Sequence, residues 1–170
     1  MNLNRVPSFL FKNPTAWLHI HQTLIEAIRG TGNNNPILVE GWAWGQDAAS
    51  WGENEVNSAI LGFGDQIDGA YENIIFSHHV YDQWRGSTDR LKNYVDGVLE
   101  KGYALVVGEY STENNDKSTM PATESMFEVN VPRGVGRIVW TWIGSGCGDG
   151  RSSAALNAKE RVIFIPPIAI

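Results

Sequence analysis

The sequence predicts an α/β fold made of four β/α units in series, with parallel strands. Two observations predict it. Short apolar runs alternate with longer stretches in which apolar residues recur at helical spacing. The starts of the apolar runs lie roughly 30–37 residues apart, which is the length of one strand plus a crossover helix. Strands that are apolar throughout suit a parallel sheet covered on both faces.

The first unit begins with a helix and continues into a short strand. Asn13 and Pro14 form a capping residue followed by proline at the first helical position. Apolar residues then recur at helical spacing up to Ile28, and Gly30 and Gly32 end the pattern. A β-type run follows at residues 37–39.

The later units repeat this alternation. A weaker helical stretch across residues 56–63 precedes a predicted strand at residues 73–77. A helix that starts near Ser87 and ends at Gly102 precedes the strand at residues 104–108. Pro121 opens the last helix, and the fourth strand is predicted at residues 137–142.

Composition indicates one globular domain over residues 1–170, with terminal arms at 1–13 and 151–170. Of the 170 residues, 42% are hydrophobic and 19% are charged, and the net charge is −6. The acidic balance offers no basic patch for nucleic acid or an anionic membrane. Seven Trp and five Tyr suit an uncharged polymer, because aromatic faces pack against the C–H faces of sugars. Core filling is the alternative role of these aromatic residues.

Other site classes have little support in the sequence. Cys147 stands alone, which excludes an intramolecular disulfide and a cysteine-based zinc site. We expect no metal and no cofactor. No signal peptide is recognised, and the apolar runs are too short to cross a bilayer, so we expect a domain outside the membrane whose localisation stays open.

The carboxyl ends of the predicted strands carry polar and aromatic residues. In parallel α/β folds the working residues lie at these ends. The residues found there are Glu40, Trp42 and Trp44; His78, His79 and Tyr81; Glu109 and Tyr110; and Trp140 and Trp142. Carboxylate, His, Tyr and Trp side chains on one rim are the groups that sugar chemistry requires.

Four stretches in this order resemble a known family. They are the region around the turn WGQD at residues 44–47, then NIIFSHHVY, ALVVGEY and GRIVWTWIGSG. Together they resemble the fourth helix and strands five to eight of clan A, family 5 glycoside hydrolases, and most closely the β-mannanases and endoglucanases. The resemblance covers most of residues 14–146. It implies the C-terminal half of a (β/α)8 TIM barrel.

The resemblance also implies roles for individual residues. Glu109 matches the nucleophile of a retaining glycosidase, although an ordinary rim ion pair is the alternative for a glutamate there. His79 and Tyr81 match the family's His-x-Tyr, with Tyr81 bonded to the nucleophile. The substrate-binding candidates are Trp140, Trp142, Trp42, Trp44 and, as the alternative register, His78.

A general acid/base is the missing part of this set. The resemblance implies that it stands at the end of the family's fourth strand, which has no counterpart among the four predicted strands. Glu40 and Asp47 are possible acid/base residues on the rim of the first strand. A retaining pair needs carboxyl groups about 5–5.5 Å apart, and an inverting pair about 6.5–9.5 Å.

Half a barrel leaves two sheet edges and one sheet face uncovered, so a homodimer or higher oligomer is expected. The predicted function is retaining hydrolysis of a β-1,4-linked polysaccharide, either glucan or mannan. A carbohydrate-binding remnant without catalysis is the alternative from a different class. A truncated reading frame without activity is a third interpretation.

Overall fold

The computed structural model describes residues 14–48, 58–114, 117–140, 145–147 and 151–153. Its centre is a parallel sheet of four strands. In spatial order they are β1 (Ile37–Glu40), β2 (Ile74–Val80), β3 (Leu105–Tyr110) and β6 (Gly136–Val139). Each strand pairs with the next one along the chain, as in a (β/α)8 barrel. The predicted α/β class with four parallel strands is confirmed.

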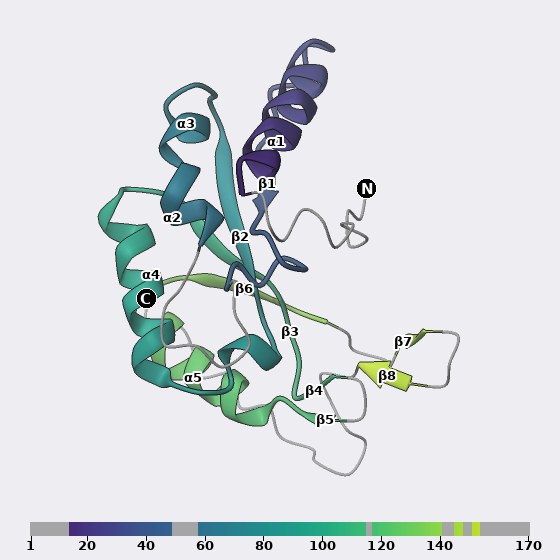
Figure 1. The fold of residues 1–170 in the computed structure, drawn as a ribbon, viewed down its shortest axis with the longest axis vertical. Helices are drawn as coiled ribbons and strands as arrows, with labels where there is room; N and C mark the ends of the chain where they lie inside the picture. The colour runs from purple at the N-terminus through teal and green to yellow at the C-terminus, as the bar shows by residue number, and fades with distance from the viewer. Residues whose placement is uncertain (1–13, 49–57, 115–116, 141–144, 148–150, 154–170) are drawn as a thin grey trace.

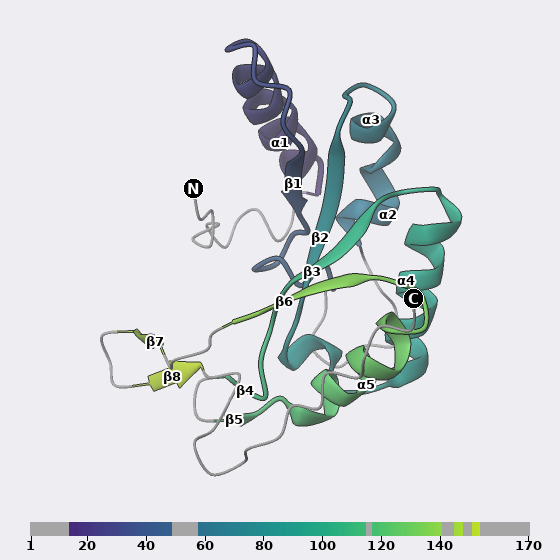
Figure 2. The same cartoon turned by 180° about the vertical axis from the view of Figure 1, so that it is seen from behind.

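The helices lie between these strands in sequence and cover one side of the sheet. They are α1 (Pro14–Arg29), α2 (Ala59–Phe63), α3 (Asp65–Asp68), α4 (Thr88–Glu100) and α5 (Met120–Asn130), with a 3-10 turn η2 (Asp82–Trp84). Helix α1 contacts α2 and α3, α2 contacts α4, and α4 contacts α5. Figures 1 and 2 show α2 to α5 following one another along one side of the sheet, with α1 beside the β1 edge. No helix in the described ranges has the length and apolarity to cross a membrane.

The helix ends follow the sequence signals. The Ser87 side chain accepts from the Arg90 backbone N–H and so caps α4. Ser58 caps α2 in the same way through the Leu61 N–H. Two glycines, Gly32 at φ +81 and Gly102 at φ +80, lie in the left-handed region just after α1 and α4.

Two short antiparallel pairs were not predicted from the sequence. They are β4 (Glu113–Asn114) with β5 (Lys117–Ser118), and β7 (Ser145–Cys147) with β8 (Arg151–Ser153). Strands of two or three residues are too short to show the period-two pattern. Residues 1–13 and 154–170, which hold most of the two proposed terminal arms, lie outside the described residues.

The two faces of the sheet differ in burial. The face under the helices is apolar and buried; its side chains include Val39, Phe76, Val80 and Val107, each 0% exposed. On the opposite face, Leu38 of β1 is 45% exposed and Ile138 of β6 is 52% exposed. The outer strands β1 and β6 therefore carry apolar side chains that nothing covers within the described part of the chain.

Candidate active site

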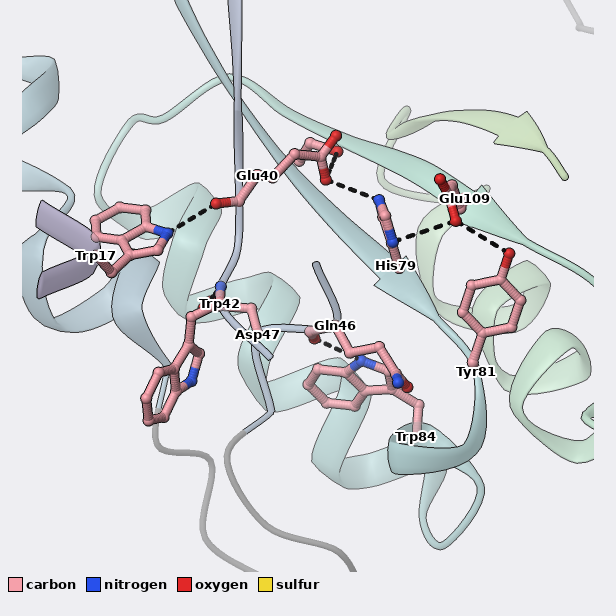
Figure 3. Close-up of polar contacts among 10 residues, drawn as sticks. Trp17, Glu40, Trp42, Gln46, Asp47, His79, Tyr81, Trp84 and Glu109 are labelled. Atoms are coloured by element: carbon pink, nitrogen blue, oxygen red, sulfur yellow. Dashed lines mark hydrogen bonds and ion pairs between the residues drawn. The ribbon is translucent and has the colours of Figure 1, made fainter. Parts of the chain in front are cut away.

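His79 stands between two carboxylates on the uncovered face of the sheet, near the carboxyl ends of the strands. Its Nε2 lies 2.7 Å from Oε2 of Glu40, which ends β1. Its Nδ1 lies 3.4 Å from Oε2 of Glu109 on β3. The side chain of His79 is 3% exposed, that of Glu109 16% and that of Glu40 41%. Figure 3 shows the imidazole between the two acids.

The register of the sheet brings these side chains together. His79 pairs with Glu109 after an irregularity between His78 and His79, and Glu40 pairs with Ser77. Parallel neighbours in register point to the same face, so residues from three strands converge there. The approach of Glu40 to Nε2 is short but bent away from the N–H direction, so the contact is mainly electrostatic.

Glu40 is held in the ionised form. Its Oε2 accepts a hydrogen bond from the buried Ser77 hydroxyl at 3.1 Å. Burial alone raises the pKa of Glu40, but the contacts with His79 and Ser77 outweigh it and hold the pKa below its usual value. A carboxylate with a lowered pKa is a poor proton donor, which disfavours Glu40 as the acid/base in this arrangement.

Tyr81 supplies a second contact to Glu109. Its hydroxyl donates to Glu109 Oε2 at 3.3 Å, so the same carboxylate oxygen faces both Tyr81 and His79. Burial, and then the adjacent charge of Glu109, raise the pKa of Tyr81 far above its ordinary value. The phenol therefore stays protonated and acts as a donor at neutral pH. The contact expected between Tyr81 and Glu109 is present, and the role of Tyr81 in a reaction stays a prediction.

Asp47 is not on the rim, which corrects its place among the acid/base candidates. It is 0% exposed, and burial raises its pKa to about 6 despite the hydrogen bonds that it accepts. The donors are the backbone N–H groups of Trp42, Ala59 and Ile60 and the hydroxyls of Ser58 and Tyr94. A carboxyl group so enclosed has no route to a sugar, and its role is structural.

His78 is corrected in the same way. It lies on the helix-covered face of β2 and is 0% exposed, with its ring 5.1 Å from Tyr94 and 6.0 Å from Trp84 between centroids. Neither ring nitrogen has a hydrogen-bond partner in the described structure. Burial lowers the pKa of His78 to about 3, so the ring is neutral and packs as a core side chain. It is unavailable to substrate.

The tryptophan candidates occupy different environments. Trp44 is 44% exposed and Trp140 is 39% exposed, so both can offer a ring face to a ligand. Trp140 follows β6, and its backbone N–H donates to the Tyr110 carbonyl at 2.9 Å. Trp42 is partly buried and packs against the core. Trp142 lies outside the described residues.

Three contributors to the site were missed from the sequence. Ser77 bonds Glu40, and a single small polar residue inside an apolar strand was the available signal. The indole N–H of Trp17 donates to the Glu40 carbonyl at 2.8 Å and so fixes the end of β1 to α1. The Gly45 carbonyl accepts from the His79 backbone N–H at 2.8 Å. Within the described residues, no group of three His, Cys, Asp or Glu side chains is placed to hold a metal ion.

A family model matches this chain over residues 8–146. The family is described as cellulase, glycosyl hydrolase family 5. The chain belongs to glycosyl hydrolase family 5. The resemblance found in the sequence is thereby confirmed.

Curated family 5 relatives are all considerably longer than this chain. A mannan endo-1,4-β-mannosidase of Streptomyces lividans is 27% identical over 136 residues, which are 80% of this chain and 33% of the relative. One from Cellvibrio japonicus is 28% identical over 145 residues, 85% of this chain and 32% of the relative. The chain thus spans about a third of the length of these relatives.

Solved family 5 structures share the fold. The β-mannanase of Streptomyces thermolilacinus matches with a TM-score of 0.66 at 19% identity, over 79% of this chain and 43% of that one. The Thermomonospora fusca β-mannanase in complex with mannohexaose matches with a TM-score of 0.62 at 21% identity, over 82% and 42%. A match to about two fifths of these chains is consistent with half of a barrel.

Proposed function

We propose that this chain is the nucleophile-bearing half of a retaining glycoside hydrolase acting on a β-1,4-linked polysaccharide, either mannan or glucan. The observation that carries the proposal is the Glu109 carboxylate near the end of β3, engaged by both His79 and Tyr81. A carboxylate positioned there by two neighbouring side chains is suited to attack an anomeric carbon.

The reaction divides into two displacements. Glu109 attacks the anomeric carbon, the glycosidic C–O bond breaks, and a covalent glycosyl ester forms. Water then attacks the same carbon and releases Glu109. The Tyr81 hydroxyl stabilises the charge on Glu109 in the free enzyme, and His79 fixes the position of the carboxylate relative to Glu40. The sugar chain is proposed to bind to four tryptophans, Trp140, Trp142, Trp42 and Trp44.

Mannan is the first substrate to test. The relatives from Streptomyces lividans and Cellvibrio japonicus are named mannan endo-1,4-β-mannosidases. Another, from Caldicellulosiruptor saccharolyticus, is named β-mannanase/endoglucanase A, at 25% identity over 76% of this chain. These names support mannan as the substrate to test first and β-1,4-glucan as the second.

The general acid is proposed to come from a second polypeptide. Glu40 has a lowered pKa and Asp47 is enclosed, so neither is suited to protonate a leaving group. A second copy of the chain, bound across the uncovered sheet face, would bring another Glu109 to the same rim. In that arrangement one Glu109 serves as acid to the other, which requires that repulsion between the two carboxylates keep one of them protonated against the effect of its own Tyr81.

The deciding experiment measures reducing-sugar release from β-1,4-mannan and β-1,4-glucan by the wild type and by Glu109→Gln. We expect activity that the substitution abolishes. Aryl glycosides with good leaving groups are the companion substrates, because they need little protonation. Hydrolysis of aryl glycosides alone would place the missing acid outside this assembly. Activity that survives Glu109→Gln would refute the role of Glu109.

A carbohydrate-binding role without catalysis is the second candidate. It is favoured by the exposure of Trp44 and Trp140 together with the lack of a suitable acid among the described residues. It predicts binding of mannan or glucan without hydrolysis, lost on Trp140→Ala and retained on Glu109→Gln. Affinity gel electrophoresis with each polysaccharide measures both outcomes.

A further inference from the structure

The loop at residues 41–48 has an unusual backbone. Ala43 (φ +54), Trp44 (φ +57) and Asp47 (φ +54) all lie in the left-handed region, which is disfavoured for residues that carry a Cβ atom. Such strain persists only where the surrounding structure over-determines it, and it concentrates at functional sites. The loop therefore requires something that holds it in place.

The buried carboxylate of Asp47 holds this loop. It accepts from the Trp42 N–H at 3.3 Å within the loop and from the Ala59 N–H at 2.9 Å at the start of α2. The Tyr94 hydroxyl of α4 donates to it at 3.1 Å. One side chain thus ties the loop to two helices, and its removal would leave several buried donors without a partner.

The loop contacts His79 through Gly45. The Gly45 carbonyl accepts from the His79 backbone N–H at 2.8 Å. A Cβ atom on Gly45 would lie 2.6 Å from both Cε1 and Nδ1 of the His79 ring, so the glycine backbone is packed directly against the imidazole. Nδ1 is the atom that faces Glu109. The loop therefore limits where this ring can lie.

Gln46 fixes the other side of the loop. Its side-chain carbonyl accepts from the Gln83 N–H at 3.0 Å, and its backbone carbonyl accepts from the Trp84 indole at 2.9 Å. Gln83 and Trp84 belong to η2, which directly follows Tyr81. Figure 3 shows the contact between Gln46 and Trp84 beside the group formed by Glu40, His79, Glu109 and Tyr81.

The geometry points to Asp47 as a positioning residue that holds the strained loop so that Gly45 packs against His79 and keeps the imidazole between Glu40 and Glu109. It acts through the loop and touches no substrate. The inference deepens the proposed function and rests on it for the part that His79 plays in the reaction. The placement of the ring is open to test without any activity.

Gly45→Ala tests the contact between loop and ring, with Gly102→Ala as the matched control. Both glycines have left-handed backbones, at φ +76 and φ +80, but a Cβ on Gly102 meets nothing within 4 Å. The readout is the ¹⁵N chemical shifts of the histidine ring nitrogens. We expect Gly45→Ala to move the His79 signals and to lower kcat by about 10- to 100-fold, because small misplacements of a catalytic site are costly. Gly102→Ala should do neither.

Asp47→Ala tests the clamp, with Val98→Ala as its control. Val98 is fully buried on α4, so the control loses core packing while the loop stays intact. Both variants should lower Tm, but only Asp47→Ala should move the His79 ring signals and kcat. Tyr94→Phe removes one donor to Asp47 and should give a smaller effect in the same direction; it serves as the second variant if Asp47→Ala does not fold.

The two readouts separate the inference from the proposed function. Unchanged His79 ring signals in folded Gly45→Ala, or in folded Asp47→Ala and Tyr94→Phe, would overturn the positioning role. Shifted ring signals in a protein without hydrolytic activity would support the positioning role while the proposed function fails.

Discussion

Two side chains approach a single oxygen of Glu109. Tyr81 Oη lies 3.3 Å and His79 Nδ1 lies 3.4 Å from Oε2. The Tyr81 hydroxyl donates to this oxygen, and a hydrogen bond to an ionised group stabilises that group more than one to a neutral group does. Each of the two neighbouring side chains can be removed separately by substitution.

Tyr81→Phe should lower kcat/KM on mannan by about 10- to 100-fold, the equivalent of one hydrogen bond to a charged group. Without the donor the anion is less favoured, so the acidic limb of the pH–rate profile should move to higher pH. Tyr71→Phe is the control, because the Tyr71 hydroxyl donates to Glu26 at 2.9 Å on an exposed surface. An unshifted acidic limb in Tyr81→Phe would contradict the role of this hydroxyl.

Asp47 should make the free energy of unfolding decrease as pH rises. Its pKa is raised by burial from 3.8 to about 6, so the folded state binds the proton more tightly than the unfolded chain. This contribution favours the fold below about pH 4 and is lost as pH rises to about 6, on the order of 2–3 kcal/mol. Urea unfolding of the wild type and of Asp47→Asn between about pH 4 and pH 6 measures this contribution, as a difference between the two proteins in the slope of unfolding free energy against pH.

Asp65 should make the free energy of unfolding rise with pH, opposite to the effect of Asp47. Lys101 and Tyr103 hold the pKa of this carboxyl below its ordinary 3.8. Asp65→Asn should therefore remove stability that is present above pH 4 and lost on acidification. Equal pH slopes for the wild type and both variants would show that neither carboxyl is coupled to folding.

At the level of the elements, the Ser77 side chain of β2 packs directly against Gly108 of β3 beside the site. A Cβ on Gly108 of β3 would lie only 2.2 Å from the Ser77 Oγ and 3.4 Å from the His79 ring. Ser77 in turn bonds Glu40. A glycine at position 108 is therefore the condition for the strand register that brings Glu40, His79 and Glu109 together.

Gly108→Ala should destabilise the protein by about 1–3 kcal/mol through overpacking. Gly62→Ala in α2 should act in the opposite direction and stabilise it by about 0.5–1 kcal/mol, because alanine is the better helix former and a Cβ there meets nothing within 4 Å. Urea denaturation of both variants measures the change in unfolding free energy, which should be a decrease for Gly108→Ala and an increase for Gly62→Ala. A neutral Gly108→Ala would mean that the strands can separate at little cost.

The sequence predicted the elements better than their ends. Apolar runs located all four strands, because apolar residues stand on both faces of these strands, although the face opposite the helices is buried only in part. The strand predicted to stop at Gly108 continues to Tyr110, because glycine and glutamate interrupt an apolar run without interrupting the hydrogen-bond ladder. The resemblance favoured His79 and kept His78 as the alternative register, because the apolar pattern around them does not show which of the two faces the site; residues 76–80 are all buried.

The loop at residues 41–48 was the least predictable part of the site. Ala43 and Trp44 are not residue types that signal a left-handed backbone, so no local rule indicates the turn. Asp47 was named as a rim acid because it follows a strand; its burial depends on Ser58 and Tyr94, which are distant in sequence. Contacts of this range are set by the tertiary fold.

For the molecule as a whole, the main unfavourable feature is the sheet face that no described residue covers. Leu38 and Ile138, on the two outer strands, are 45% and 52% exposed. Half-exposed apolar side chains beside unpaired strand edges favour association with another half-barrel.

A solution mass of two chains is expected from light scattering coupled to size exclusion. Leu38→Asp should shift that mass towards one chain, whereas Ile28→Asp, at a 36% exposed site on α1, should leave it unchanged. Hydrolysis should fall together with association if the second copy completes the rim. A single-chain mass for the wild type would exclude the homodimer.

Among the residues that the structure describes, the indoles include a buried pair and an exposed pair that should differ in fluorescence. Trp84 and Trp17 are 0% and 6% exposed, whereas Trp44 and Trp140 are 44% and 39% exposed. Buried indoles emit at shorter wavelength and are shielded from a collisional quencher such as acrylamide; exposed indoles are not. A polysaccharide lying on the exposed rings would protect only the long-wavelength emission, whereas unfolding would expose both populations. One fluorescence titration can therefore distinguish a bound sugar chain from a loss of structure.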